Sequence, residues 1–261
     1  MATLTVGDQV VGYAIEGEGT PLLLLHGTTM DRAAWDMVRA AFPADAGLQC
    51  VMVEFPGSGE SSMPGAGLTV EGLADQAHAV MLHLGHDRYH VAGYSLGAVV
   101  AAGVAARHSG QVASATLLCG WVATDARMRF TFDLWKRLID AGPELFMRYA
   151  IADGFTAEAI AGLEPMLPDV VAMGSAAIAA GSHAHLDLDI VVDIASMLPG
   201  IAAPTLVISG EQDRWVDVRH SRALAEGIAG ARLEVLPAGH LVIQELAADV
   251  ARLLHAHIAA A

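Results

Sequence analysis

The feature that most constrains the fold is a regular alternation of short apolar runs with longer stretches of helical periodicity. The predicted strands lie at residues 4–6, 9–15, 21–26, 49–54, 89–94, 112–119, 204–209 and 232–236, and the predicted helices at 31–42, 70–84, 96–107, 218–228 and 243–257. The first two strands meet at Gly7-Asp8, a pair typical of a hairpin turn. Strands that alternate with helices pair in parallel through right-handed crossovers. The sequence therefore predicts an α/β protein with a doubly wound, mostly parallel sheet.

The alternation stops for one long stretch and then resumes. Between residues 120 and 199 the periodicity is helical, and no strand-like run appears before residue 204. Because strand and helix alternate again after this stretch, it is better described as an insertion than as a separate domain. We expect a core formed by residues 1–120 and 200–261, with a helical cap, or lid, at residues 121–199.

Composition excludes several classes of function. The formal net charge of −15 repels phosphates and anionic lipids, so neither nucleic acid nor a membrane is an expected partner. Cys50 and Cys119 stand alone in apolar runs without the spacing of a metal site, so we expect buried free thiols and a cytoplasmic protein. A small-molecule substrate is the expected partner, and a homodimer is the one assembly that we keep open.

A five-residue motif stands where a predicted strand meets a predicted helix. Gly93-Tyr94-Ser95-Leu96-Gly97 matches the pattern G-x-S-x-G at the junction of residues 89–94 with residues 96–107. A sharp turn there raises the serine hydroxyl above the sheet, and the two glycines leave room because they have no β-carbon. The alternative is a glycine-rich turn with an incidental serine.

Four further motifs follow predicted strands. They are His26-Gly27, the loop from Phe55 to Ser61, Glu211-Gln212-Asp213, and Ala238-Gly239-His240. Together with the serine motif they resemble the α/β-hydrolase fold superfamily, in the branch with a serine nucleophile, and the resemblance extends over nearly the whole chain. Within that superfamily the sequence is most similar to small bacterial carboxylesterases and enol-lactonases.

The resemblance implies a role for each matching residue. Ser95 would be the nucleophile, His240 the base that accepts its proton, and Asp213 the acid that orients the imidazole. The backbone amides of Thr28 and Leu96 would form the oxyanion hole. The order Ser, Asp, His, with each residue just beyond a strand, places all three at the carboxyl edge of the sheet. This chemistry requires no metal and no organic cofactor, so none is expected.

Two positions need comment. Glu54 stands where the family loop usually carries Asp, so the contact that braces this loop is expected to change. Glu211 is an alternative to Asp213 as the acid, although the family position favours Asp213. The pairs His183 and His185, and His255 and His257, have no neighbouring carboxylate or thiol at metal spacing, and we assign them to the surface or the cap.

The expected reaction is hydrolysis through an acyl-enzyme. A serine at position 95 argues against dehalogenases and epoxide hydrolases, which carry Asp there. We therefore expect a serine hydrolase that cleaves an ester, lactone or thioester of a largely apolar small molecule. Two alternatives stay open: a cyclase or lyase that uses the same pocket with His240 as base, and a ligand receptor with negligible turnover.

The substrate pocket is expected to be apolar. The cap is rich in aromatic residues and Met, which suit a shape-tolerant pocket. The residues predicted to line it are Met30, Trp121, Phe132, Trp135, Trp215 and Leu241. We therefore expect an uncharged acyl or alcohol group of medium size. In the competing hypothesis Arg127, Arg129 or Arg148 turns inward to bind a substrate carboxylate.

Overall fold

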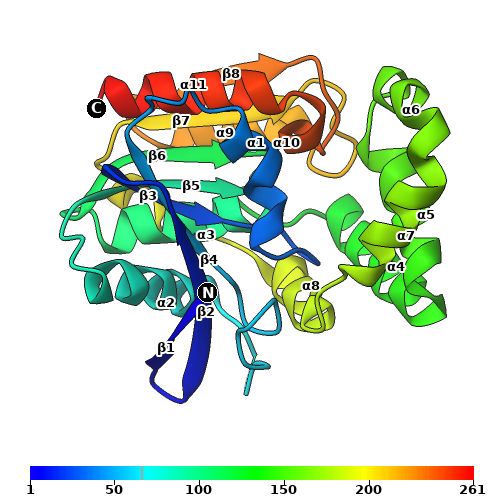
Figure 1. Ribbon diagram of the computed structural model, residues 1–261, viewed down its shortest axis with the longest axis horizontal. Coiled ribbons are helices and arrows are strands. Elements are labelled where there is room, and N and C mark those ends of the chain that lie inside the picture. Colours follow the sequence, from blue (N-terminus) through cyan, green and yellow to red (C-terminus); the bar gives the residue numbers. More distant parts are fainter. Residues whose placement is uncertain (66) are drawn as a thin grey trace.

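The computed structural model describes residues 1–65 and 67–261 and contains one eight-stranded sheet (Figure 1). The strands are β1 (Ala2–Val6), β2 (Gln9–Glu16), β3 (Thr20–Leu25), β4 (Leu48–Val53), β5 (Tyr89–Tyr94), β6 (Val112–Leu118), β7 (Thr205–Gly210) and β8 (Arg232–Leu236). Their order is β1-β2-β4-β3-β5-β6-β7-β8, and only the pairs β1–β2 and β2–β4 are antiparallel. The eight predicted strands and the doubly wound α/β fold class are confirmed.

Helices cover both faces of the sheet (Figure 1). On one face lie α1 (Asp36–Ala40) and α11 (Ala247–Ala259), and on the other lie α2 (Val70–His83), α3 (Leu96–Arg107) and α9 (Val218–Gly227). The four consecutive leucines of strand β3 show why both faces need cover. Leu22 and Leu24 pack into the core beneath α11, whereas Leu23 and Leu25 pack into the core beneath α3. Successive side chains of a strand point to opposite faces, so a strand buried on both sides must be apolar throughout.

Two predicted helices differ from those observed. The helix predicted at residues 31–42 begins as a 3-10 turn (Arg32–Trp35) capped by Asp31, and only then continues as α1. The helix predicted at residues 243–257 is divided into α10 (Val242–Glu245) and α11, because Leu246 has a non-helical ψ of 44°. The break leaves α10 beside the His240 loop while α11 packs against the sheet, and residue periodicity does not report such a change of direction.

The segment between β6 and β7 forms five α-helices, with bounds α4 (Ala126–Ala141), α5 (Pro143–Gly154), α6 (Ala157–Leu163), α7 (Leu167–Ala176) and α8 (Ser182–Val191). Two short 3-10 helices, Glu164–Met166 and Leu198–Gly200, accompany them. In Figure 1, α4 to α7 stand to one side of the sheet, beyond the carboxyl ends of its central strands. No helix in the described part of the chain has the length and apolar character needed to cross a membrane.

Glu54 braces the loop that follows β4. Its carboxylate is fully buried and accepts hydrogen bonds from Arg32 Nη1 at 2.6 Å and from the Glu60 amide at 2.7 Å. Its backbone carbonyl accepts from Ser61 Oγ at 2.7 Å. The longer side chain therefore makes its own bracing contacts at the position where the family that the sequence resembles usually has Asp.

We expect the Glu54→Ala variant to be destabilised by about 2–4 kcal/mol, because it leaves the Glu60 amide and the Arg32 guanidinium without their acceptor. Chemical denaturation measured by circular dichroism tests this. Glu60→Ala is the matched control, since that side chain is exposed. Equal stability of the two variants would contradict the bracing role.

Candidate active site

Ser95 occupies a strained turn between β5 and α3. Its backbone has φ 56° and ψ −120°, a conformation that residues with a β-carbon rarely adopt. A β-carbon on Gly93 would lie 1.9 Å from the Gly97 carbonyl oxygen, and one on Gly97 would lie 2.2 Å from the Leu25 carbonyl oxygen. The expectation that both glycines of the motif leave room for the turn is confirmed.

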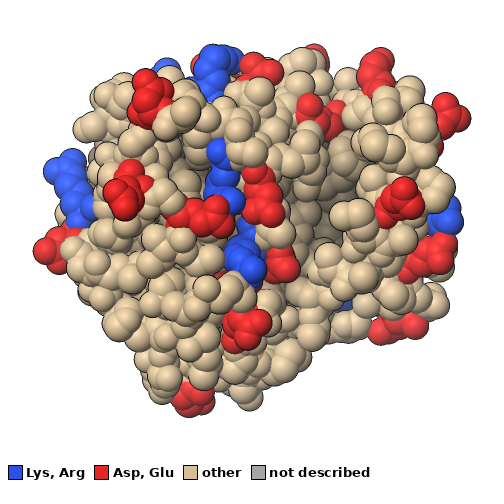
Figure 2. Space-filling model, viewed as in Figure 1, with Lys and Arg blue, Asp and Glu red and all other residues tan. Residues whose placement is uncertain are grey.

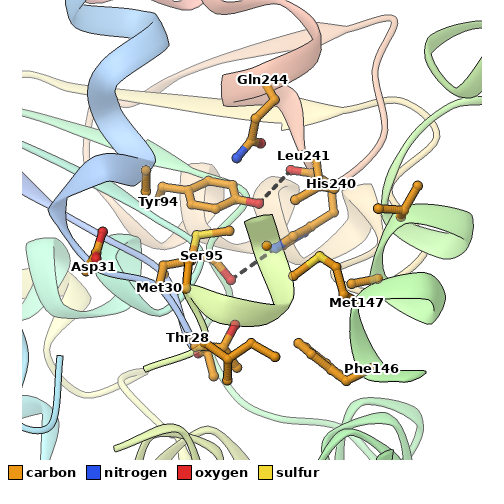
Figure 3. A pocket seen from close by; sticks show the side chains of 18 of the residues that line it. Thr28, Met30, Asp31, Tyr94, Ser95, Phe146, Met147, His240, Leu241 and Gln244 are labelled. Carbon is orange, nitrogen blue, oxygen red and sulfur yellow. Dashed lines mark hydrogen bonds between the residues drawn. The ribbon is translucent and has the colours of Figure 1, made fainter. Parts of the chain in front are cut away.

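The structure brings Ser95, His240 and Asp213 together. His240 Nε2 lies 3.0 Å from Ser95 Oγ (Figure 3). On its other side, His240 Nδ1 lies 2.7 Å from Asp213 Oδ2. His240 comes from the loop after β8, and Asp213 from the loop after β7. All three residues are buried, whereas Glu211 is exposed.

Hydrogen bonds fix the acid and the tautomer of the imidazole. Asp213 Oδ1 accepts from the amides of Trp215 at 2.9 Å and Val216 at 2.8 Å, which leaves Oδ2 for His240. Because a carboxylate only accepts, the proton of the neutral imidazole is assigned to Nδ1. Nε2 then has a free lone pair directed at the Ser95 hydroxyl. This arrangement can remove the hydroxyl proton as the oxygen attacks.

The amides of Thr28 and Leu96 lie on the two segments that meet at Ser95. Leu96 is the first residue of α3, where an amide has no acceptor within the helix. Thr28 follows Gly27, whose missing β-carbon would lie 3.2 Å from Ser95 Cβ. Within the described residues, neither amide donates to another group of the protein. Both remain available for an oxygen of a bound molecule.

The side chain of His26 stabilises the turn that contains Thr28. Its Nε2 accepts from the Phe55 amide at 3.0 Å, so its Nδ1 carries the proton and donates to the Gly27 carbonyl at 2.8 Å. Burial lowers the pKa of His26 to about 3, so the ring is neutral. His26 therefore links the Gly27 turn to the loop after β4.

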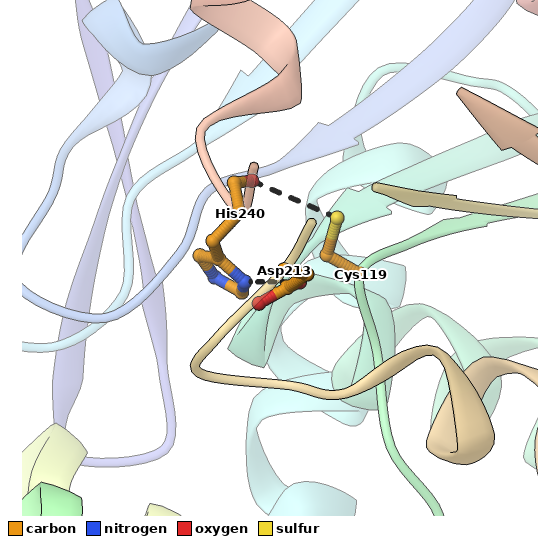
Figure 4. A group of neighbouring side chains, drawn as sticks. All are labelled: Cys119, Asp213 and His240. Atoms are coloured by element: carbon orange, nitrogen blue, oxygen red, sulfur yellow. Dashed lines mark hydrogen bonds and ion pairs between the residues drawn. The ribbon is translucent and has the colours of Figure 1, made fainter. Parts of the chain in front are cut away.

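The thiol of Cys119 lies close to Asp213 and His240. The sulfur of Cys119, a carboxylate oxygen of Asp213 and a ring nitrogen of His240 lie within 4.8 Å of one another. Figure 4 shows the three side chains as neighbours. Asp213 and His240 are already bonded to each other, and Cys119 Sγ donates to the His240 carbonyl oxygen. Burial raises the pKa of the Cys119 thiol well above its usual value, which disfavours the thiolate that a metal needs. These contacts account for the cluster without a metal ion.

A cavity of about 430 Å³ opens over Ser95 and His240. Four of the six residues predicted to line it do so: Met30, Trp135, Trp215 and Leu241. Trp121 and Phe132 were expected there and are not among its lining residues. The Trp121 ring is fully buried, donates its indole N–H to Thr124 Oγ1, and packs against Phe132 at a centroid distance of 5.9 Å. Both side chains belong to the core under the helical segment.

Sequence reasoning missed several residues of the cavity wall. Residues of α5 and α7 supply much of its apolar surface, among them Phe146, Met147, Ile151, Val170 and Met173. Tyr94, Asp31 and Gln244 add polar groups. The high Met and aromatic content of the segment was the available signal, but it did not distinguish the face toward the cavity from the face toward the core.

Charge is sparse around this cavity. No Lys or Arg lines it, and Asp31 is its only acidic lining residue in the described part of the chain. Figure 2 shows a hollow walled largely by uncharged residues. Arg148 pairs with Glu144 on the surface, and Arg129 donates to the Thr124 carbonyl. Arg127 is exposed. The predicted alternative of an inward-facing arginine is therefore wrong.

Trp215 joins α5 to the imidazole. Its indole N–H donates to Asp153 Oδ2 at 2.9 Å, and its ring lies 4.8 Å from the His240 ring between centroids. The Leu241 amide donates to the Gly154 carbonyl at 3.1 Å. The end of α5 is thus bonded to the loops that carry both Asp213 and His240.

Comparison with known proteins gives the family. The sequence is 29% identical to a protein named "Pyrrolizixenacetamide deacetylase" from Xenorhabdus hominickii, over 92% of this chain and 91% of that protein. The fold of this chain matches that of an enol-lactonase from Burkholderia xenovorans LB400 (TM-score 0.86, 23% identity, covering 99% of this chain and 100% of the lactonase chain). It also matches a thermophilic esterase from Thermogutta terrifontis (TM-score 0.84, 23% identity, 99% and 96%). Residues 22–253 match the Alpha/beta hydrolase family, and the chain belongs to that family.

Proposed function

We propose that this α/β hydrolase cleaves an ester, lactone or thioester of a neutral, largely apolar small molecule through an acyl-enzyme on Ser95. The observation that carries the proposal is the pair of contacts at His240: Nε2 at 3.0 Å from Ser95 Oγ, and Nδ1 at 2.7 Å from Asp213 Oδ2. A serine hydroxyl is a weak nucleophile until a positioned base accepts its proton. This geometry supplies the base and fixes its orientation.

The reaction proceeds in two steps, acylation and deacylation. Ser95 Oγ attacks the substrate carbonyl carbon while His240 Nε2 takes the hydroxyl proton, and the carbonyl oxygen becomes an oxyanion held by the Thr28 and Leu96 amides. Collapse expels the alcohol or thiol, which takes the proton from His240. Water then attacks the acyl-enzyme, gives a proton to His240, and the acid leaves as Ser95 regains its proton. Asp213 offsets the positive charge of the imidazolium in each step.

Residues 121–199 act as a cap in this proposal. Helices α5 and α7 supply apolar cavity walls opposite Ser95 and His240. An apolar wall favours substrates whose uncharged portion leaves water on binding. The name of the Xenorhabdus relative refers to deacetylation, and an acetyl group is a small neutral acyl group. Both points support a neutral acyl group here.

The substrate charge is the first quantity to measure. For matched esters that differ only in a terminal carboxylate, we expect kcat/KM to favour the neutral ester by more than about tenfold, because desolvating a carboxylate without a cation is costly. The control is Asp31→Asn, which removes the acidic group that lines the cavity among the described residues and should reduce the preference for the neutral ester. A preference for the anionic ester would overturn the neutral-substrate proposal.

A panel of esters, lactones and thioesters tests the chemistry itself. For an ester whose acyl-enzyme forms faster than it is hydrolysed, we expect a burst of released alcohol equal to the enzyme concentration. A cyclase or lyase using His240 as base would retain turnover in Ser95→Ala. A receptor would bind panel members without turnover at any pH.

A further inference from the structure

A buried carboxyl group lies directly behind the oxyanion turn. Asp189, on α8, is fully buried, and its Oδ2 lies 2.6 Å from Thr28 Oγ1. Its other oxygen, Oδ1, is buried without a hydrogen-bond partner in the described part of the chain. Burial raises the pKa of Asp189 to about 8, while the Thr28 hydrogen bond acts in the opposite direction. A buried carboxyl with one unpartnered oxygen is more stable as the neutral acid.

Helix α8 is fastened to the turn that Asp189 contacts. The Ala179 amide, just before α8, donates to the Thr29 carbonyl at 3.0 Å, and His185 Nε2 donates to the Pro56 carbonyl at 2.9 Å. Thr124 Oγ1 donates to the Asp189 carbonyl oxygen. These contacts hold the Asp189 backbone on both sides. The carboxyl group therefore has a fixed position relative to Thr28.

We propose that Asp189 is a positioning residue for the oxyanion hole, that it acts as the neutral acid through the Thr28 hydroxyl, and that its ionisation at alkaline pH lowers the rate of acyl transfer. The inference rests on the proposed function, because it assumes that the Thr28 amide stabilises the oxyanion. It assigns to the helical segment a part in the chemistry beyond forming a pocket wall.

The physical reason is the charge that develops during the reaction. The oxyanion forms beside the Thr28 amide, and the side chain of the same residue contacts Asp189. A neutral carboxyl adds no charge there and keeps the turn in place. An ionised carboxylate, in a buried region of low dielectric, would repel the oxyanion and raise the barrier.

No countercharge is bonded to Asp189 in the described chain. On α8 itself, Asp187 pairs with Lys136 of α4 and His183 pairs with Asp140 of α4. The ring of His185 has a pKa lowered to about 4 by burial, and the turn's own His26 is neutral. Most other charged or titratable groups of the packed elements have partners of their own: Arg129 with the Thr124 carbonyl, Asp125 with Arg219, Asp133 with Arg137, Asp31 with the Ala33 amide, and Asp213 with His240. Arg127 of α4 is exposed.

The test is the pH dependence of kcat/KM for a neutral ester in the wild type and in Asp189→Asn. Asn has nearly the same shape and can still bond to Thr28, but it does not ionise. We expect the wild-type value at pH ~9.5 to be about tenfold below its value at pH ~7.5, and the variant value to be level over this range. Asp187→Asn, which removes an exposed charge from the same helix, should keep the wild-type profile. An alkaline decrease that persists in Asp189→Asn would overturn the inference.

A second measurement on the wild type needs no variant and no turnover. The folded-state pKa of about 8 exceeds the ordinary 3.8, so the folded state binds more protons than the unfolded state between these values. This carboxyl's contribution to stability is therefore full below pH ~4 and is lost as pH rises to ~8. The carboxylic-acid carbonyl band of Asp189 should be visible by infrared spectroscopy at neutral pH and disappear through pH ~8.

Failure of the inference about Asp189 and failure of the proposed function give different results. If the band disappears only at acidic pH, Asp189 is ionised in the working enzyme and the inference is wrong, whatever the rate data show. If neutral esters are hydrolysed with no alkaline decrease in the wild type, the inference is wrong and the proposed function stands. Absence of turnover at every pH contradicts the proposed function, and with it the catalytic part of this inference.

Discussion

Ser95→Ala is expected to lower kcat/KM for a neutral ester by about 10⁴-fold or more, because the covalent route is lost and only binding and the oxyanion hole remain. The substitution removes one oxygen from a site where the backbone turn is already held by Gly93 and Gly97, so the fold should persist. Steady-state kinetics, with circular dichroism as the check on folding, measures this.

The matched control is Ser175→Ala, on α7, whose hydroxyl bonds to the Val171 carbonyl and does not line the cavity. It should retain wild-type turnover within a factor of about three. If Ser95→Ala keeps more than about a tenth of wild-type activity, the nucleophile has been assigned wrongly.

Asp213→Asn has the second largest expected effect, a decrease in kcat of about 10³–10⁴-fold. The amide N–H₂ of Asn facing His240 Nδ1 would favour the tautomer with its proton on Nε2, which can no longer accept from Ser95. The folded state should be retained, because the amide oxygen can still accept from the Trp215 and Val216 amides.

Glu211→Gln is the control for the acid, since Glu211 lies two residues away in the same loop and is exposed. It should have little effect on kcat. If Asp213→Asn had little effect on kcat and Glu211→Gln lowered it strongly, Glu211 would be the acid. Stopped-flow measurement of the acylation step separates this effect from changes in product release.

The sheet was predictable because its signal is local. Most strands are short, largely apolar runs bounded by turn residues, and strand β3 is apolar from Pro21 to Leu25 because its leucines are buried on both faces. Ser95, Asp213 and His240 were assigned from their motifs and from the family resemblance. The strand pattern added that all three lie at one edge of the sheet, since each stands just beyond a strand and parallel strands end at one edge. The break at Leu246 has no comparable signal, because residues on both sides of it remain helical.

The cavity wall was only partly predictable because it depends on contacts between distant segments. Phe132 and Trp135 lie on the same face of α4, yet Trp135 lines the cavity whereas Phe132 packs against Trp121. From the sequence alone, Asp189 is indistinguishable from an ordinary polar residue on a helix. Its partner Thr28 lies 161 residues earlier. Nothing in the local pattern at residue 189 indicates burial, so only the packed structure reveals the pair.

The most direct test of the central claim, covalent catalysis by an activated Ser95, is mass spectrometry of the folded protein after reaction with a fluorophosphonate. We predict one adduct per chain, located on the peptide that contains Ser95, and no adduct in Ser95→Ala. Labelling should slow strongly in Asp213→Asn, because the hydroxyl loses its base. An adduct on another residue, or no adduct on folded wild-type protein, would contradict the account.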